Sequence, residues 1–216
     1  MTLQYRAIVF DLDGVLWDGE PLYLEAFNVV LRPLGHELAA PEYEQIIGSS
    51  IEAAWQWVIQ RFELTGTEQL HTTYDGAVLD LLAQPVEPLP GARETIARLK
   101  SIPVPVGLAS ASLRQWVDAT LAGIGLAGEF EATVSASEVK RAKPAPDMYL
   151  KAAEKLGVPA SDCIAIEDTR TGVASARAAG MYVVQLRAAS TALPPIEEAD
   201  AVIESYAEFD FSPLGG

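Results

Sequence analysis

The pattern that most constrains the fold is a regular alternation of helix-like and strand-like segments from Ala92 onward. Short apolar runs rich in β-branched residues alternate there with segments whose apolar residues recur at helical spacing. The expected helices cover 92–100, 113–121, 146–156 and 171–179, and the expected strands cover 106–109, 132–134, 163–166, 182–186 and 201–203. Such alternation predicts an α/β fold, a doubly wound parallel sheet of Rossmann-like architecture.

One more strand is expected near the start of the chain, before a stretch that reads as helices. Ala7–Phe10 is wholly apolar and stops at an acidic turn, as a buried parallel strand does. Three prolines and Gly91 mark a stiff connector after the helical stretch. We therefore expect an α/β core of residues 1–17 and 87–216, with a small α-helical cap domain of residues 18–86 inserted after the first strand. The helices expected in that insertion cover 22–31, 43–47, 51–62 and 68–82.

Composition narrows the partners of the protein. The chain has 216 residues, half of them hydrophobic, which is enough for a substantial core. Its formal net charge of -15 argues against broad contact with nucleic acid or an anionic membrane, so small molecules are the expected partners. Cys163 is the only cysteine, and the first residues carry no signal-peptide pattern, so we expect a cytoplasmic protein. The oligomeric state cannot be predicted.

The end of the first expected strand carries two acids. Asp11 and Asp13 are one residue apart, and Gly14 lets the chain turn sharply after them. Carboxylates this close repel each other, which raises the pKa of one and allows one to act ionised while the other donates a proton. A plain turn is the alternative, because Asp and Gly are common turn formers.

Other expected strand ends carry further polar residues. Ser110 ends one strand and can hold a phosphate oxygen, although Ser112 as a helix N-cap with Ser110 as a linker explains that segment equally well. Lys143 lies in a basic cluster stiffened by prolines, and taken alone such a cluster is more often a solvated surface patch. Glu167 and Asp168 end another strand and offer the oxygen ligands that suit Mg²⁺, but Asp168 can also cap the next helix. Carboxyl ends of parallel strands share one edge, so these residues are expected to converge there.

These four segments resemble the four ordered motifs of the haloacid dehalogenase superfamily, in its phosphatase branch with an α-helical cap. The first motif, D-x-D-G, is matched by residues 11–14, and the second by the strand that ends at Ser110. The K-P-A-P-D wording of the family selects Lys143, and the acidic pair is matched by Glu167 and Asp168.

The resemblance implies a phosphohydrolase that uses Mg²⁺. Asp11 is then the nucleophile that forms an aspartyl-phosphate, and Asp13 the general acid and base. The implied phosphate-binding residues are Ser110, Ala111 and Lys143, and the implied metal ligands are Asp11, Asp13 and Asp168, with Glu167 acting through water. A small phosphomonoester of sugar phosphate or phosphoglycolate type is the expected substrate.

Three alternatives remain open at this stage. A haloacid dehalogenase of the same superfamily works without Mg²⁺ and is not expected to keep Asp13. A β-phosphoglucomutase-like enzyme carries charged cap residues where this chain has Ile47 and Ile51 around Gly48, and a histidine where it has Tyr23. A non-catalytic binding protein of the same fold is the third. Trp55 and Trp57 face different ways on their expected helix, so one is expected to pack in the cap and the other to be exposed toward the active site or a partner, with core packing as the first expectation.

Overall fold

The computed structural model describes residues 5–47, 49, 51–65, 67–189 and 194–214. The chain forms two compact units. Met1–Asp18 and Val86–Gly216 make the first, here called the sheet unit, and Gly19–Pro85 makes the second, here called the helical unit. None of the helices in the described ranges is both long and apolar enough to cross a membrane.

The sheet unit is built on a parallel sheet. Within the described residues the strands lie in the order β3-β2-β1-β4-β5-β6. Their bounds are Ala7–Phe10 for β1, Val106–Ser110 for β2, Ala132–Ser135 for β3, Cys163–Glu167 for β4, Tyr182–Leu186 for β5 and Ala201–Ile203 for β6. The strand order reverses at β1, which pairs with β2 on one side and β4 on the other. The predicted doubly wound parallel sheet is therefore confirmed, with its switch point at β1.

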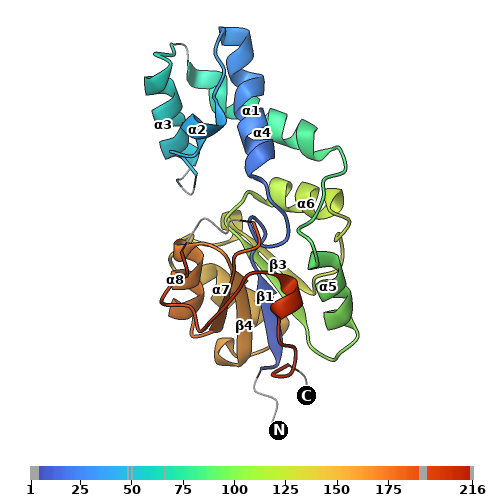
Figure 1. The fold of residues 1–216 in the computed structure, drawn as a ribbon. Coiled ribbons are helices and arrows are strands. Elements are labelled where there is room, and N and C mark those ends of the chain that lie inside the picture. Colours follow the sequence, from blue (N-terminus) through green and yellow to red (C-terminus); the bar gives the residue numbers. More distant parts are fainter. Residues whose placement is uncertain (1–4, 48, 50, 66, 190–193, 215–216) are drawn as a thin grey trace. The chain divides into compact units, whose positions relative to one another are not determined.

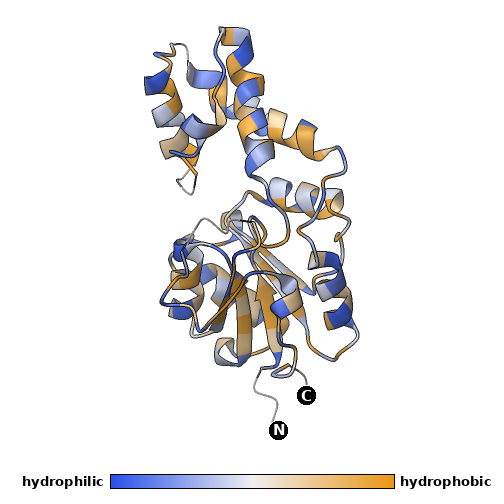
Figure 2. Cartoon of the chain, viewed as in Figure 1, coloured by the Kyte–Doolittle hydropathy of each residue, from blue (hydrophilic) through white to orange (hydrophobic). Residues whose placement is uncertain are grey.

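Helices cover both faces of this sheet, as Figure 1 shows. The pair α7 (Asp147–Leu156) and α8 (Arg170–Ala178) lies on one face, and the pair α5 (Ala92–Lys100) and α6 (Arg114–Gly123) on the other. The strands carry mostly apolar residues (Figure 2), because helices on both faces of the sheet bury most of its side chains. Every residue of β1 is fully buried, which places the end of β1 at the centre of the unit.

The helical unit packs around aromatic side chains. Its α-helices are α1 (Glu20–Leu31), α2 (Ala40–Tyr43), α3 (Ile51–Arg61) and α4 (Leu70–Leu82). The Phe27 ring lies 4.8 Å from the Trp55 ring and 4.6 Å from the Tyr74 ring, measured between centroids. Trp55 is fully buried and Trp57 is partly exposed, so the expected packing role holds for Trp55.

One predicted helix is wrong. We expected a helix over 43–47, but α2 ends at Tyr43 and 44–47 form turns. Pro41 occupies the first turn of α2, where its missing N–H is harmless, and the Glu42 carboxylate accepts a hydrogen bond from the Ala39 N–H at 3.2 Å. Pro41 and Glu42 are helix start signals, and they come before the segment 43–47, for which apolar residues had indicated a helix. Short 3-10 turns cover Arg32–Leu34, Thr67–Gln69, Ala136–Glu138, Ala160–Asp162 and Tyr206–Glu208.

Candidate active site at the carboxyl edge of the sheet

Asp11 stands directly after β1, at the centre of the sheet edge. Its N–H donates to the Ile166 carbonyl oxygen at 2.9 Å, so the ladder with β4 continues one residue beyond the strand. Gly14 then turns the chain with a φ of +73°, and a Cβ there would lie 2.0 Å from Asp168 Oδ2. Only glycine therefore allows the loop after Asp11 to lie against the end of β4.

Lys143 joins two of the acids. Its Nζ donates to Asp11 Oδ1 at 2.6 Å and to Glu167 Oε1 at 2.5 Å, and its side chain is only 7% exposed. The alternative of a solvated surface patch is therefore wrong for Lys143, whereas its neighbours Lys140 and Arg141 are exposed. The loop before α7 brings the ammonium group to the end of β1.

Glu167 is completely buried, and several donors surround its carboxylate. The Tyr149 hydroxyl donates to Oε1 at 2.6 Å, and the Asp168 N–H donates to Oε2 at 3.2 Å. A Cβ on Gly172 would lie 2.0 Å from the Glu167 carboxyl carbon, so glycine is needed there for close packing. The Tyr149 contact was missed from the sequence. Its only signal was a tyrosine among the buried positions of the helix that follows Lys143.

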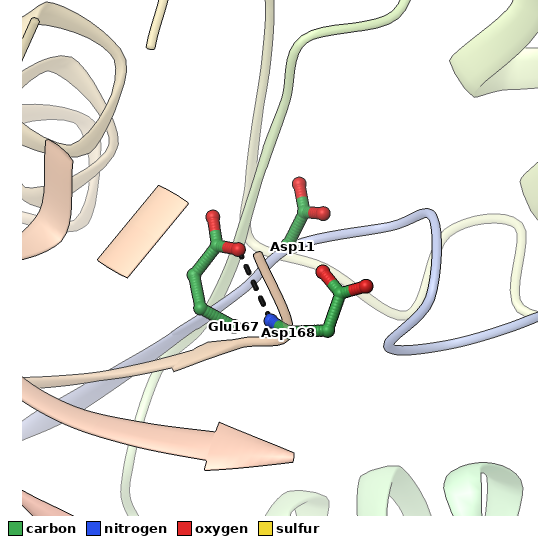
Figure 3. Close-up of side chains that lie close together, drawn as sticks. All are labelled: Asp11, Glu167 and Asp168. Carbon is green, nitrogen blue, oxygen red and sulfur yellow. Dashed lines mark hydrogen bonds between the residues drawn. The ribbon is translucent and has the colours of Figure 1, made fainter. Parts of the chain in front are cut away.

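Asp168 does not cap the helix that follows it. The N-cap of α8 is Thr169, whose hydroxyl oxygen accepts from the Gly172 N–H at 3.1 Å. The capping alternative for Asp168 is therefore wrong, and its Oδ1 is buried without a hydrogen-bond partner among the described residues. Asp11, Glu167 and Asp168 each offer an oxygen within 4.8 Å of the others, and Figure 3 shows these side chains at neighbouring strand ends.

The charge at this edge is unbalanced. Burial raises the pKa of Asp11 to about 7, aided by Glu167 and Asp13 and opposed by Lys143. Burial, with Glu167 and Asp11 as negative neighbours, also raises the pKa of Asp168 well above its ordinary value. Burial alone would lower the pKa of Lys143, but Asp11 and Glu167 overcome this and raise it. One lysine does not neutralise this group of carboxylates, so a further cation is favoured here.

Asp13 lies beside this group, with its own donors. Its Oδ2 accepts from the Ser112 hydroxyl at 2.9 Å, and its Oδ1 accepts from the Trp17 indole N–H at 3.2 Å. Ser112 is not the cap of α6, because that position belongs to Leu113, so the capping alternative is wrong. Ser110 is fully buried, and its hydroxyl oxygen accepts from the Ser112 N–H at 3.1 Å. The contacts that Ser112 and Trp17 make with Asp13 were not predicted.

Comparison with known proteins agrees with this architecture. Residues 5–180 match the family model of haloacid dehalogenase-like hydrolases. A probable pseudouridine-5'-phosphatase of Drosophila melanogaster is 32% identical over 96% of this chain and 92% of its own length. A fructose-1-phosphate phosphatase of Escherichia coli (strain K12) is 34% identical over 87% of this chain and 99% of its own. The crystal structure of CbbY from Rhodobacter sphaeroides in complex with phosphate shares the fold, with a TM-score of 0.80, 24% identity and coverage of 94% of this chain and 96% of that one. This chain therefore belongs to the haloacid dehalogenase-like hydrolase family, as its motifs predicted.

Proposed function

We propose that this protein is a Mg²⁺-dependent phosphatase that hydrolyses a small phosphomonoester through an aspartyl-phosphate on Asp11. The observation that carries the proposal is the buried pair of Asp11 and Lys143, which lies beside an Asp168 oxygen that has no partner among the described residues. The names of the two sequence relatives support the phosphatase reaction. The helical unit would be the cap domain of such an enzyme.

The residues at the edge fit a Mg²⁺ ion. Asp11 and Asp168 would hold it through carboxylate oxygens and Asp13 through its backbone carbonyl, while Glu167 would act only through water because its own carboxylate already accepts from Lys143 and Tyr149. When bound, Mg²⁺ neutralises the carboxylates and the phosphate oxygens that approach them. The buried Asp168 Oδ1, which has no hydrogen-bond partner in the described part of the chain, is the feature that such a cation would satisfy.

The proposed reaction has two steps, each with a role for Asp11 and Asp13. An oxygen of Asp11 attacks phosphorus, the bond from phosphorus to the ester oxygen breaks, and Asp13 gives its proton to the leaving alkoxide. A water molecule then attacks the phosphorus of the aspartyl-phosphate and loses a proton to Asp13. The bond between Asp11 and phosphorus breaks, and inorganic phosphate leaves. The raised pKa of Asp11 falls when positive charge adjoins it, which favours the ionised nucleophile.

Three residues are proposed to hold the phosphoryl oxygens. Lys143 supplies a fixed positive charge, because its ammonium group is already held by two carboxylates. The Ser110 hydroxyl accepts from the Ser112 N–H, which leaves its own proton for a phosphate oxygen. The Ala111 N–H would complete the set. Preorganised donors of this kind stabilise the charge that develops in the transition state.

We further propose that the phosphoryl group goes to water and that the substrate is a sugar phosphate or a similar small ester. In the helical unit, Ile47 is exposed and Ile51 half-buried, and neither offers the charge expected of a mutase; Gly48 lies outside the described residues. Cys163 is buried as a free thiol, which is compatible with the proposed cytoplasmic location.

The test is hydrolysis of p-nitrophenyl phosphate and of a panel of phosphorylated metabolites, with Mg²⁺ and with a chelator. We expect turnover that needs Mg²⁺, and an Asp11→Asn variant at least about a thousandfold slower. Asp80→Asn, at an exposed position of the helical unit, is the matched control and should keep full activity. Turnover that survives both the chelator and Asp11→Asn would refute the proposal.

A further inference from the structure

We infer that Trp17 is a positioning residue that holds the carboxylate of Asp13 in place for proton transfer. The inference rests on the proposed function, because it assigns Asp13 the role of general acid and base. It extends that function to a side chain outside the four motifs. Its basis is the hydrogen bond from the indole N–H to Asp13 Oδ1, at 3.2 Å.

Trp17 is itself held by the backbone around it. The Gly14 N–H donates to the Trp17 carbonyl oxygen at 2.9 Å, and short β-bridges join Trp17 to Asp13 and to Pro88. The side chain is only 2% exposed. A large, buried ring on a loop tied at several points has little freedom to move, so its N–H presents a fixed donor to Asp13.

A second donor reaches Asp13 from a different part of the fold. The Ser112 hydroxyl, on the turn between β2 and α6, donates to Oδ2 at 2.9 Å. Trp17 and Ser112 therefore each hold one oxygen of the same carboxylate. Two donors on separate segments fix both the position and the rotation of the group, which one donor alone would not do.

The two donors differ in what they allow chemically. An indole N–H can only donate, whereas a serine hydroxyl can donate or accept after rotation about its C–O bond. Oδ1 therefore stays an acceptor throughout the cycle, and Oδ2 is the oxygen that gives its proton to the leaving alkoxide and takes one from water. Trp17 thus fixes the orientation of the Asp13 carboxylate, while the Ser112 hydroxyl donates to Asp13 when it is ionised and accepts from it when it is protonated.

Trp17→Phe removes the indole N–H and keeps an aromatic ring, so it separates positioning from packing. The sensitive substrate is an ester with an alkoxide leaving group, such as fructose 1-phosphate, because an alkoxide must be protonated as it leaves. p-Nitrophenolate needs no proton, so p-nitrophenyl phosphate reports the rest of the site. We expect kcat/KM on the alkyl ester to fall about tenfold and kcat/KM on the aryl ester to stay within about twofold, because kcat/KM reports the steps up to departure of the leaving group and leaves out the water step, in which Asp13 serves both esters.

Two further variants sharpen the comparison. Ser112→Ala should shift the ratio of the two kcat/KM values in the same direction as Trp17→Phe. Trp55→Phe is the matched control, because the Trp55 indole N–H is buried without a partner among the described residues. It should leave the ratio unchanged.

An NMR spectrum supplies a readout that does not depend on turnover. The indole N–H resonance that disappears in Trp17→Phe identifies Trp17, and Asp13→Ala should shift this resonance while the one lost in Trp55→Phe stays in place. Equal losses of kcat/KM on both esters in Trp17→Phe, or an indole resonance that does not shift in Asp13→Ala, would overturn the role of Trp17. A wild-type protein that hydrolyses neither ester would overturn the proposed function instead. The indole resonance would still test the contact between Trp17 and Asp13, because that readout needs no turnover.

Discussion

Two clusters of charged side chains in the sheet unit differ in their balance of charge. The edge cluster consists of Asp11, Asp13, Lys143, Glu167 and Asp168. The helix cluster lies on α6, α7 and the 3-10 turn Ala136–Glu138, and it consists of Arg114, Asp118, Glu138, Lys151 and Lys155. Carboxylates outnumber cations in the first, and cations outnumber carboxylates in the second.

The pKa values express this difference. Burial would raise the pKa of Glu138, but Lys155 and Arg114 lower it to about 2, whereas the pKa of Asp11 rises to about 7. The cations around Glu138 outweigh the effect of its burial on the pKa, whereas Lys143 does not offset the effect of burial on the pKa of Asp11, to which Glu167 and Asp13 add. A cluster with enough cations, such as that around Glu138, is typical of charges that stabilise a fold, whereas a deficit of cations, such as that around Asp11, is typical of sites that bind a metal or a charged substrate.

Removing the lysine of the edge cluster should have the largest effect. Lys143→Met leaves Asp11 and Glu167 buried without their cation, so we expect a loss of about 3–5 kcal/mol in the free energy of unfolding, together with loss of turnover. Lys140→Met, in the same loop but exposed, should change stability by less than about 0.5 kcal/mol. Urea titration of both variants provides the measurement. Equal unfolding midpoints would contradict the expectation that only the buried lysine is needed for stability.

Adding Mg²⁺ should stabilise only a protein whose edge cluster is intact. At 100 times its dissociation constant the ion adds about 2.7 kcal/mol to the free energy of unfolding, which for a chain of this size raises Tm by roughly 5–10 °C. Asp168→Asn should lose this shift. Without metal it should be at least as stable as the wild type, since a buried and repelled carboxylate has become neutral.

Asp118→Asn, in the helix cluster, is the matched control for calorimetry with and without Mg²⁺, and it should keep the full rise in Tm. A similar rise in Asp168→Asn would place the ion elsewhere on the protein.

Tyr149→Phe should lower the free energy of unfolding by about 2 kcal/mol, because the buried Glu167 carboxylate loses a charged hydrogen bond of 2.6 Å. Tyr182→Phe is the control on β5, since no hydrogen bond of its hydroxyl group is found among the described residues. It should cost less than about 0.5 kcal/mol. Thermal unfolding of the two variants provides the measurement. Equal losses in the free energy of unfolding would mean that the Tyr149 hydroxyl contributes nothing beyond packing.

Glu138→Gln should have the smallest effect. We expect the free energy of unfolding to fall by about 1 kcal/mol at neutral pH, because Glu138 is partly solvated. The folded pKa of about 2 lies below the ordinary value of 4.5, so the stabilisation is present above about pH 4.5 and is lost as pH falls toward 2. Wild type and variant should therefore converge in acid. Glu94→Gln, exposed on α5, is the control and should follow the wild-type curve at every pH. A difference that persists at pH 2 would exclude the ion pairs as its source.

The sheet and its edge could be predicted because they depend on local patterns. Ala7–Phe10 and Cys163–Glu167 are apolar runs that end in acids, and parallel strands bring such ends together whatever the details of packing. The convergence of these residues therefore followed from residue types and strand ends, whereas their expected chemical roles came from the resemblance to the haloacid dehalogenase superfamily. Helix boundaries were harder, and the start of α2 at Ala40 was missed because Pro41 and Glu42 were not weighed as start signals.

The contacts of Tyr149, Trp17 and Ser112 could not be predicted, since each depends on where one polar tip ends up. The sequence assigned no role to Tyr149 or Trp17, and in the structure both are buried. Their hydroxyl and indole groups reach Glu167 and Asp13 only because the loops after β1 and β3 bring those residues together. A sequence pattern shows burial but not the direction of a single donor.

The central position of β1 also has a consequence for the order in which the protein is made. The ribosome releases β1 first, yet both of its sheet partners, β2 and β4, come much later in the chain. At about 5–20 residues per second, roughly ten to thirty seconds separate the synthesis of Phe10 from that of Glu167. During that time the apolar segment Ala7–Phe10 has two open hydrogen-bonding edges, while the helical unit is already complete. Asp11, the proposed nucleophile, thus stays without its buried partners until synthesis of the chain is well advanced.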